Sequence, residues 1–310
     1  MDYRAFVEEQ TDYIRKQVGD GLAINALSGG VDSSVVTVIG HRALGDRLKT
    51  IFIDNALMRA GEPTSVVDVF RDMCIPVEVI DARAEFLGAL RGLTDPEDKR
   101  NAITKTFYET VFGKIVRDSG AKFLLHGTIL TDIEESVAGI KRQHNILAQL
   151  GIDPQAAYGY QVLEPLRELR KDGVREVARA LGLPARVAER MPFPGPALSA
   201  RIVGEVTSER LETVRQATAI VEEELADSGA FQYLAVLLED KATGIRDGRR
   251  EFGQIIVVRC LHSTDAREAT VVEVPWARLH RICDRITAIP GVNRCLYDLT
   301  PKPPATIEYV

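Results

Sequence analysis

Seven consecutive residues near the start of the chain are those best suited to chemistry. They read Ser28-Gly29-Gly30-Val31-Asp32-Ser33-Ser34, after the apolar stretch 22–27 and before the apolar stretch 35–39. Adjacent glycines let backbone N–H groups turn inward around an anion, and a helix that starts there adds the positive end of its dipole. The serine hydroxyls can donate to phosphate oxygens, and Asp32 can hold a magnesium ion. The segment therefore predicts a phosphate-binding loop between a strand and a helix.

The loop differs from the common nucleotide-binding loop and from an ordinary turn. The common nucleotide-binding loop has a lysine and then a serine or threonine after its second glycine, whereas Asp32 and Ser33 occupy this part of the chain. An ordinary strand-to-helix turn would use the glycines for chain reversal and Ser28 as a cap. Such a turn does not require two glycines, an acid and three hydroxyl groups together.

The elements that position this loop alternate between strand and helix patterns. Apolar, β-branched runs predict strands at 22–27, 50–54, 76–81, 122–126 and 161–164, and helical patterns cover 63–73, 97–117 and 173–181. This alternation predicts an α/β fold, a doubly wound parallel sheet covered on both faces. Ligands bind beyond the carboxyl ends of such strands, where Ser28, Asp54 and Gly127 are expected.

A proline-rich segment divides the chain. Three prolines lie within residues 192–196, which excludes helix and interior strand and places a domain boundary between residues 190 and 191. We therefore predict domains at 1–190 and 191–310. In the second, patterns predict helices at 208–227 and 275–288 and strands at 233–238, 254–260, 294–299 and 306–310, a smaller α+β unit.

Composition limits the classes of function. A net charge of −6 and a pI near 5.6 argue against a large nucleic-acid surface. There is no apolar run of membrane-spanning length and no apolar signal core after Met1, so we expect a cytoplasmic protein without a membrane partner. The four cysteines form no CxxC pair, and His280 with Cys283 is too small a set for a zinc site.

The loop resembles the pyrophosphate loop of the N-type ATP pyrophosphatases, and three further segments resemble the GMP synthetase family within that group. These are the lid-like residues Asp132, Glu135, Ser136, Lys141, His144 and Asn145, the proline-rich segment 192–196, and the terminal segment 302–308. Taken alone, each has a plainer interpretation: a solvated polar loop, a rigid linker, or a proline-stiffened entry to an edge strand. The family order of all four motifs favours the resemblance, which implies an adenine nucleotide α-hydrolase-like first domain and a dimerisation domain after it.

The resemblance also implies the site residues. Those expected to bind ATP are Ser28, Gly29, Gly30, Val31, Asp32, Ser33, Ser34, Ile53, Asp54 and Gly127. Those expected to contact xanthosine 5′-monophosphate (XMP) are Arg100, Gly195, Pro196, Gln232, Asp247, Lys302, Thr306, Ile307 and Glu308. Asp32, Lys141 and His144 are the expected catalytic residues, and Asp32 and Asp132 the expected ligands of Mg²⁺.

The function implied by the resemblance is ATP-dependent amination of XMP to GMP through an adenylated intermediate, with release of AMP and pyrophosphate. Only 27 residues precede the loop and none of them is a cysteine, so we expect ammonia from a separate glutamine amidotransferase subunit. The resemblance of the second domain to the family's dimerisation domain implies a homodimer.

Two alternatives belong to other classes. A tRNA-thiolation enzyme of the same superfamily would normally bring catalytic cysteines and a basic face, whereas this chain is acidic and has no CxxC pair. A non-catalytic nucleotide-binding regulatory homologue would be expected to lose lid or substrate residues, whereas Lys141, Lys302 and Glu308 are present. Gln143, Met191 and Ala197 stand where the family commonly has His, His and Gly, and these differences keep the regulatory alternative open.

Overall fold

The computed structural model describes residues 1–137, 159–191, 193–264 and 266–310. The chain divides into two compact units. The first consists of Met1–Asp54, Gly61–Ala82 and Phe107–Arg190, and the second of Asn55–Ala60, Arg83–Thr106 and Met191–Val310. Two segments of the predicted first domain, 55–60 and 83–106, therefore pack within the second unit.

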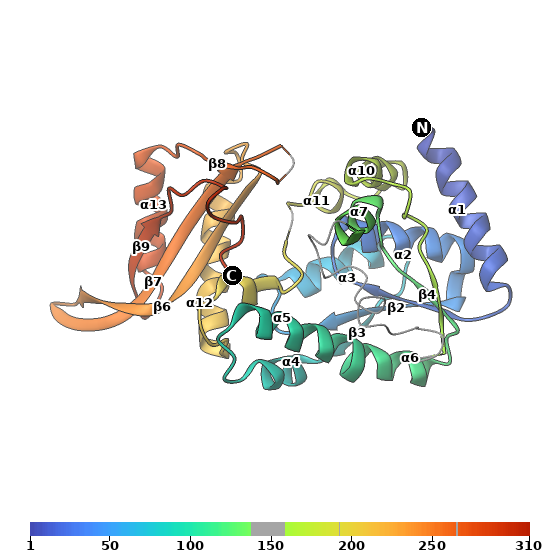
Figure 1. The fold of residues 1–310 in the computed structure, drawn as a ribbon, viewed down its shortest axis with the longest axis horizontal. Coiled ribbons are helices and arrows are strands. Elements are labelled where there is room, and N and C mark those ends of the chain that lie inside the picture. Colours follow the sequence, from blue (N-terminus) through green and yellow to red (C-terminus); the bar gives the residue numbers. More distant parts are fainter. Residues whose placement is uncertain (138–158, 192, 265) are drawn as a thin grey trace. The chain divides into compact units, whose positions relative to one another are not determined.

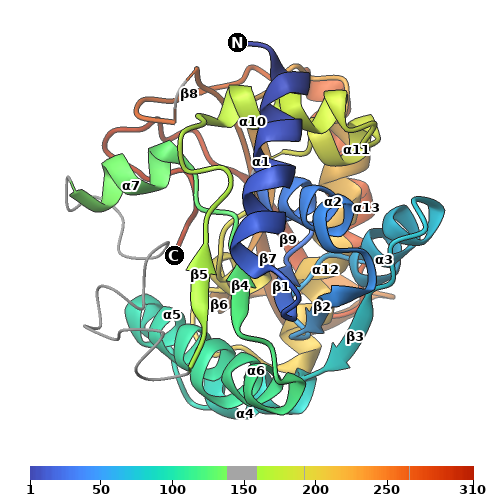
Figure 2. The same ribbon diagram turned by 90° about the vertical axis from the view of Figure 1, so that its right-hand side faces the viewer.

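The first unit is built on a parallel sheet with strand order β3-β2-β1-β4-β5, which Figure 2 shows side by side. Its strands are β1 (Ala23–Leu27), β2 (Leu48–Asp54), β3 (Glu78–Asp81), β4 (Phe123–Leu125) and β5 (Gln161–Leu163). Each of the five predicted strands is confirmed. The chain moves from β1 toward β3 on one side and then returns to β4 on the other, so the strand order reverses between β1 and β4. This reversal is the position where open α/β sheets bind ligands.

Helices cover both faces of this sheet. In Figure 1, α2 lies on one face and α6 on the other. The helical elements of the unit are α1 (Tyr3–Val18), α2 (Val31–Leu44), η1 (Gly45–Arg47), α3 (Glu62–Asp72), η2 (Thr106–Phe112), α6 (Gly113–Ser119), α7 (Leu130–Val137), α10 (Lys171–Ala180) and α11 (Ala185–Ala188). The doubly wound α/β prediction is confirmed.

Helix α2 is buried on nearly all sides because it packs between β1 and the helices α1 and α10. Every position from Ser34 to Gly40 is buried. A helix that is apolar all round belongs in the interior, which explains the run of valines after the phosphate-binding loop. The loop therefore lies at the start of a closely packed helix, and the packing of that helix fixes the position of the loop backbone.

The second unit contains a mixed sheet flanked by helices. Strand β7 pairs antiparallel with β6 and β8 and parallel with β9. The elements are α4 (Arg83–Leu90), α5 (Pro96–Lys105), η3 (Ala197–Arg201), α12 (Ser208–Glu224), β6 (Gln232–Arg246), β7 (Arg249–His262), β8 (Thr270–Val271), α13 (Trp276–Thr287) and β9 (Val292–Tyr297). The predicted α+β unit is confirmed. Its core includes Leu234, Val236 and Val257.

Two details differ from the sequence-based expectation. The predicted strand at 306–310 is absent, because Arg259 Nη2 donates to the carbonyl of Thr306 and the Thr306 hydroxyl donates to the carbonyl of Glu308 in place of a strand ladder. The segment 55–60 belongs to the second unit because Arg215 donates to the carbonyls of Ala56 and Met58, at 2.7 and 3.0 Å. Among the helices that the structure describes, none has the length and apolar character needed to cross a membrane.

Candidate active site

The phosphate-binding loop has the geometry of an anion nest. Gly29 has φ +78°, in the left-handed region, and Gly30 is extended before α2 begins at Val31. Among the described residues, no side chain caps the start of this helix. Uncapped N–H groups at a helix start favour phosphate.

The serines of the loop bond to one another and to its backbone. The hydroxyls of Ser28 and Ser33 lie 3.0 Å apart, and those of Ser33 and Ser34 donate to the carbonyl of Gly30 at 3.1 and 2.8 Å. Ser28 is exposed and Ser34 buried. Ser34 therefore supports the loop from inside, whereas Ser28 can exchange partners with a ligand.

A buried polar chain fixes the helix start beneath the loop. Thr50 donates to Asn25 at 2.8 Å, Asn25 donates to the Thr37 hydroxyl at 2.7 Å, and Thr37 donates to the carbonyl of Ser33 at 2.8 Å. Asn25, Thr37 and Thr50 are each at most 3% exposed. Because buried polar groups are costly without partners, this continuous chain specifies one arrangement of β2, β1 and α2.

Gly127 follows β4 and lies against the start of α2. A Cβ atom at this position would lie 3.2 Å from the amide nitrogen of Ser33 and 3.3 Å from the carbonyl carbon of Asp32. The loop after β4 thus passes directly against the start of α2, and a larger residue would push the two backbones apart. Ser28–Ser34 and Gly127 are brought together as predicted.

Asp32 faces a lysine that lies far away in the sequence. Lys171 Nζ, at the start of α10, is 2.6 Å from Asp32 Oδ2. The other carboxylate oxygen, Oδ1, is buried and has no hydrogen-bond partner among the described residues. A buried carboxylate oxygen without a donor is a place for a cation or a donor brought by a ligand.

The other residues expected at this site lie at the end of β2 and at the start of α7. Ile53 is buried near the end of β2, and Asp54 follows it as the last residue of that strand. Asp132 is buried, and its Oδ2 accepts from the amide of Ile129 at 3.1 Å, so this carboxylate stabilises the start of α7. Within the described residues, no three His, Cys, Asp or Glu side chains form a cluster that could hold a metal ion.

Lys141, His144 and Asn145 lie outside the described residues. The catalytic roles of Lys141 and His144 remain predictions.

In the second unit, Glu308 is at the centre of a polar cluster. Arg201 makes a bidentate contact with its carboxylate, with Nε and Nη2 each 3.1 Å from an oxygen, and Gln232 Nε2 donates to the same group. The Arg201 side chain is only 2% exposed and that of Glu308 19%. The guanidinium carbon of Arg201 lies 4.9 Å from the centre of the Phe193 ring. These contacts hold the Glu308 carboxylate in one orientation.

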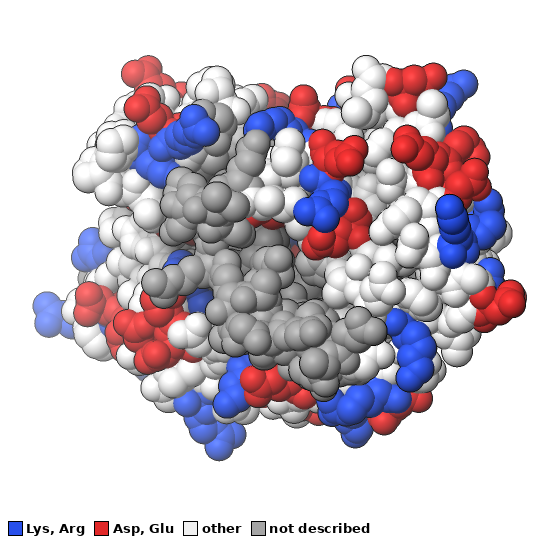
Figure 3. Space-filling model, turned by 45° about the vertical axis from the view of Figure 1, so that its right-hand side comes forward, with Lys and Arg blue, Asp and Glu red and all other residues white. Residues whose placement is uncertain are grey.

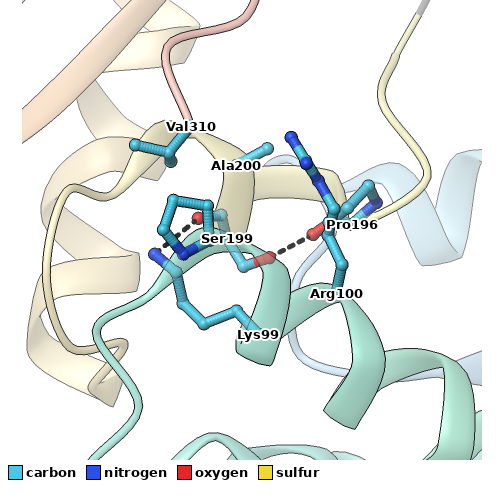
Figure 4. A pocket seen from close by; sticks show the side chains of 7 residues that line it. Lys99, Arg100, Pro196, Ser199, Ala200 and Val310 are labelled. Atoms are coloured by element: carbon cyan, nitrogen blue, oxygen red, sulfur yellow. Dashed lines mark hydrogen bonds between the residues drawn. The ribbon is translucent and has the colours of Figure 1, made fainter.

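A small pocket in the same unit brings Arg100 and Pro196 together, as Figure 4 shows. Its other lining residues are Pro96, Lys99, Ser199, Ala200 and Val310. Lys99 is 2% exposed, and its ammonium group donates to the carbonyls of Ile202 at 2.7 Å and Gly204 at 3.2 Å. Burial, with the nearby charges of Arg210 and Arg100, lowers the pKa of Lys99 to about 8.

Other predicted XMP contacts are spread along the unit. Lys302 Nζ donates to the carbonyl of Ala266 at 2.7 Å. Gly195 and Thr306 are exposed and Ile307 is half-buried. Asp247 lies in the turn between β6 and β7, at the opposite end of β6 from Gln232. Their separation along the strand is about 50 Å at the usual rise per residue, so one copy of the chain does not bring these two residues together.

Comparisons with known proteins identify the family. The family model described as the GMP synthase C terminal domain matches residues 219–309. The chain is 52% identical over 310 residues to a protein of Archaeoglobus fulgidus named as one subunit of GMP synthase (glutamine-hydrolyzing), with all of both chains covered. It is 47% identical over 318 residues to the protein of the same name in Methanopyrus kandleri, covering 100% of this chain and 99% of the relative. The chain belongs to this family of GMP synthase subunits. The resemblance drawn from the motifs is confirmed.

A solved structure similar to this chain is an NH3-dependent NAD synthetase from Campylobacter jejuni. The TM-score is 0.48 at 17% identity, over 61% of this chain and 78% of that one.

Three residues at the two sites are not predicted by the sequence motifs. Lys171 and Arg190 contact the phosphate-binding loop across 139 and 161 positions of sequence, and Arg201 contacts Glu308 across 107. Each looks like an ordinary basic residue in the sequence. The signal that the sequence offers is their place in the chain: Lys171 is the first residue of a helix, and Arg190 precedes the proline-rich segment.

The charges on the face of the chain in Figure 3 are mixed. Basic and acidic side chains are interspersed over the part of that face that the structure describes. They form no continuous basic area there, which agrees with the net charge of −6. A nucleic-acid surface would need clustered positive charge.

Proposed function

We propose that this chain catalyses the ATP-dependent amination of XMP to GMP, using ammonia from a separate glutamine amidotransferase subunit. The observation that carries the proposal is identity of 52% along the full length of a protein named as a subunit of GMP synthase (glutamine-hydrolyzing). The preorganised anion nest at Ser28–Ser34 and the rigid carboxylate of Glu308 support it, since they provide sites for a phosphate chain and for the N–H groups of a purine.

In the first step, the C2 oxygen of XMP attacks the α-phosphorus of ATP, and the bond to the bridging oxygen of the β-phosphate breaks. The N–H groups at the start of α2 and the hydroxyls of Ser28 and Ser33 bind the departing pyrophosphate. Lys171 adds a positive charge beside them. Because the N–H groups are fixed before ATP binds, they stabilise developing charge without rearranging, whereas the Ser28 hydroxyl exchanges its contacts with Ser33 and Gly30 for the phosphate.

Asp32 would hold Mg²⁺ in this site, and its buried Oδ1, without a partner among the described residues, fits that role. Magnesium usually takes one or two carboxylates and completes its shell with phosphate oxygens and water, which suits a single carboxylate beside a phosphate site. When bound, the ion neutralises phosphate charge. Asp132 is proposed as a second ligand, although one of its oxygens already accepts from Ile129.

The second step replaces AMP at the purine. Ammonia forms a bond to C2, the C2–O bond breaks, and AMP leaves with the oxygen that XMP supplied, while the nitrogen releases one proton to water and keeps two hydrogens as the amino group of GMP. Glu308, held by Arg201 and Gln232, is an acceptor for the purine N–H groups. Arg100 is proposed to bind the phosphate of XMP, and Lys141 and His144 to close over the nucleotide.

We also propose a homodimer in the cytoplasm. Ile245 and Phe252 are 77% and 69% exposed on the outer half of the β6–β7 hairpin, where a second copy could cover them. A contact between Asp247 and XMP would then come from the other copy.

The test supplies XMP, Mg-ATP and ammonium ion to the purified chain and measures nucleotides by chromatography. Formation of GMP and AMP in equal amounts, without ADP, supports the proposal. Activation of a tRNA base in place of XMP would support the thiolation alternative. Nucleotide binding without turnover of any substrate would support the regulatory alternative.

A further inference from the structure

An arginine that follows the first unit's last helix contacts the phosphate-binding loop. Arg190 Nη1 donates to the carbonyl of Gly29 at 2.6 Å, and Nη2 is paired with Glu62 Oε1. The Arg190 side chain is 16% exposed and that of Glu62 8%. The planar guanidinium group therefore joins the loop to the first turn of α3, and both partners are largely shielded from water.

The contact fixes one particular peptide unit. Because a trans peptide is planar, the carbonyl of Gly29 and the N–H of Gly30 point in opposite directions. Two adjacent glycines make this unit the easiest of the loop to rotate, since glycine adopts positive and negative φ with little cost. A rotated unit would direct a carbonyl oxygen at the phosphates in place of an N–H group.

The N–H on the other side of this peptide unit has a partner that a ligand can replace. The hydroxyl of Ser28 accepts from the Gly30 N–H at 3.3 Å, and Ser28 is exposed. A phosphate oxygen carries more negative charge than a hydroxyl group and forms the stronger bond. The Gly30 N–H is therefore available to an anion as long as the peptide unit keeps its orientation.

The packing around Gly29 matches this role. A Cβ atom there would lie 2.9 Å from Arg190 Nη1 and 2.9 Å from Val66 Cγ2. The arginine thus lies directly against the glycine, and the absence of a side chain lets it reach the backbone. Glu62 keeps the guanidinium group in that position.

We propose that Arg190 and Glu62 are positioning residues for the phosphate-binding loop. Together they hold the Gly29 carbonyl away from the anion site, so that the Gly30 N–H is directed toward the pyrophosphate of ATP before ATP binds. This inference rests on the proposed function for the identity of the phosphate ligand. The contacts of Arg190 with Gly29 and Glu62, which we call the clamp, lie within the first unit.

The charge of Glu62 gives the sharpest test. Changing Glu62→Gln removes a negative charge close to a phosphate site, so electrostatics alone predicts a lower KM for ATP. A weakened contact between residue 62 and Arg190 predicts the opposite sign, a KM for ATP raised about five- to ten-fold, because glutamine replaces a charge-assisted hydrogen bond by a neutral one of about half the strength. The KM for XMP should change less than two-fold, which a general loss of folded protein would not produce.

Arg190→Lys is the second variant, because lysine keeps the charge but cannot bridge two acceptors in one plane. We expect it to raise the KM for ATP about ten-fold. The matched control is Arg179→Lys, in the same unit, where the arginine is 46% exposed and pairs with Glu176 and Glu189. It should leave all constants unchanged.

Binding of inorganic pyrophosphate, measured by titration calorimetry, separates this inference from the proposed function. If the wild-type chain binds pyrophosphate but does not convert XMP, the proposed function fails and the clamp is still tested by the affinities of the two variants. Weaker pyrophosphate binding in both variants supports the clamp. Unchanged or tighter binding in Glu62→Gln overturns it, whatever the activity.

Discussion

Replacing Gly29 with alanine tests the geometry of the phosphate-binding loop. Alanine at φ +78° is in the left-handed region, which costs about 1–2 kcal/mol. Its methyl group would lie 2.9 Å from both Val66 and Arg190, and such overpacking costs about 1–3 kcal/mol. The reduced freedom of the unfolded chain returns about 0.4–1 kcal/mol. We therefore expect Gly29→Ala to lower the free energy of unfolding by about 2–4 kcal/mol.

Gly30→Ala is the matched control. Gly30 has φ −75°, and the nearest atom to a new Cβ is Ser28 Oγ at 3.4 Å. Alanine fits this conformation, so the free energy of unfolding should stay within about 1 kcal/mol of the wild-type value. Urea unfolding followed by circular dichroism measures both variants, and with a slope of about 3 kcal/mol/M the Gly29→Ala midpoint should fall by about 1 M. Equal stability of the two variants would refute the left-handed conformation at Gly29.

Three further predictions concern other parts of the two sites. Asp32→Ala should abolish formation of GMP, measured by chromatography, and retained turnover would exclude the ionic role of Asp32. Its free energy of unfolding should stay within about 1 kcal/mol of the wild-type value, because Lys171 is 45% exposed and Asp32 25%, so water screens their ion pair. Glu308→Ala leaves Arg201 buried without its carboxylate and should cost about 3 kcal/mol in urea unfolding, and unchanged stability would contradict the buried pair. Lys99 has a pKa of about 8 when folded against an ordinary value of 10.5, so the unfolded chain binds more protons between those pH values and Lys99 makes stability rise with pH there. The free energy of unfolding of the wild type should therefore rise relative to that of Lys99→Met from about pH 8 to about pH 10. A difference between the two proteins that does not depend on pH would show that Lys99 is not shielded from water.

Features that depend on neighbouring residues could be predicted from the sequence. The strands of the first unit follow from apolar, β-branched runs, and the loop at Ser28–Ser34 follows from two glycines and an acid before a helix. Gly127 also has a local signal, since it comes directly after a strand. These elements agree with the structure because their burial and turn chemistry point to the same arrangement.

Long-range contacts explain the differences. The helical pattern at 97–117 predicts one helix, but Lys99 bonds to carbonyls about a hundred positions later, and α5 thereby belongs to the second unit while α6 belongs to the first. The strand predicted at 306–310 is replaced by contacts from Arg259 and Arg201. Neither arginine shows in the sequence which backbone or carboxylate group it will meet.

Transfer of an oxygen atom from XMP to AMP is the most direct measurement of the proposed chemistry. XMP labelled with ¹⁸O at C2 is incubated with Mg-ATP, ammonium ion and the purified chain, and the AMP is analysed by mass spectrometry. Attack of the C2 oxygen on the α-phosphorus predicts one ¹⁸O atom in each AMP formed with GMP. AMP without the label would contradict adenylation of XMP.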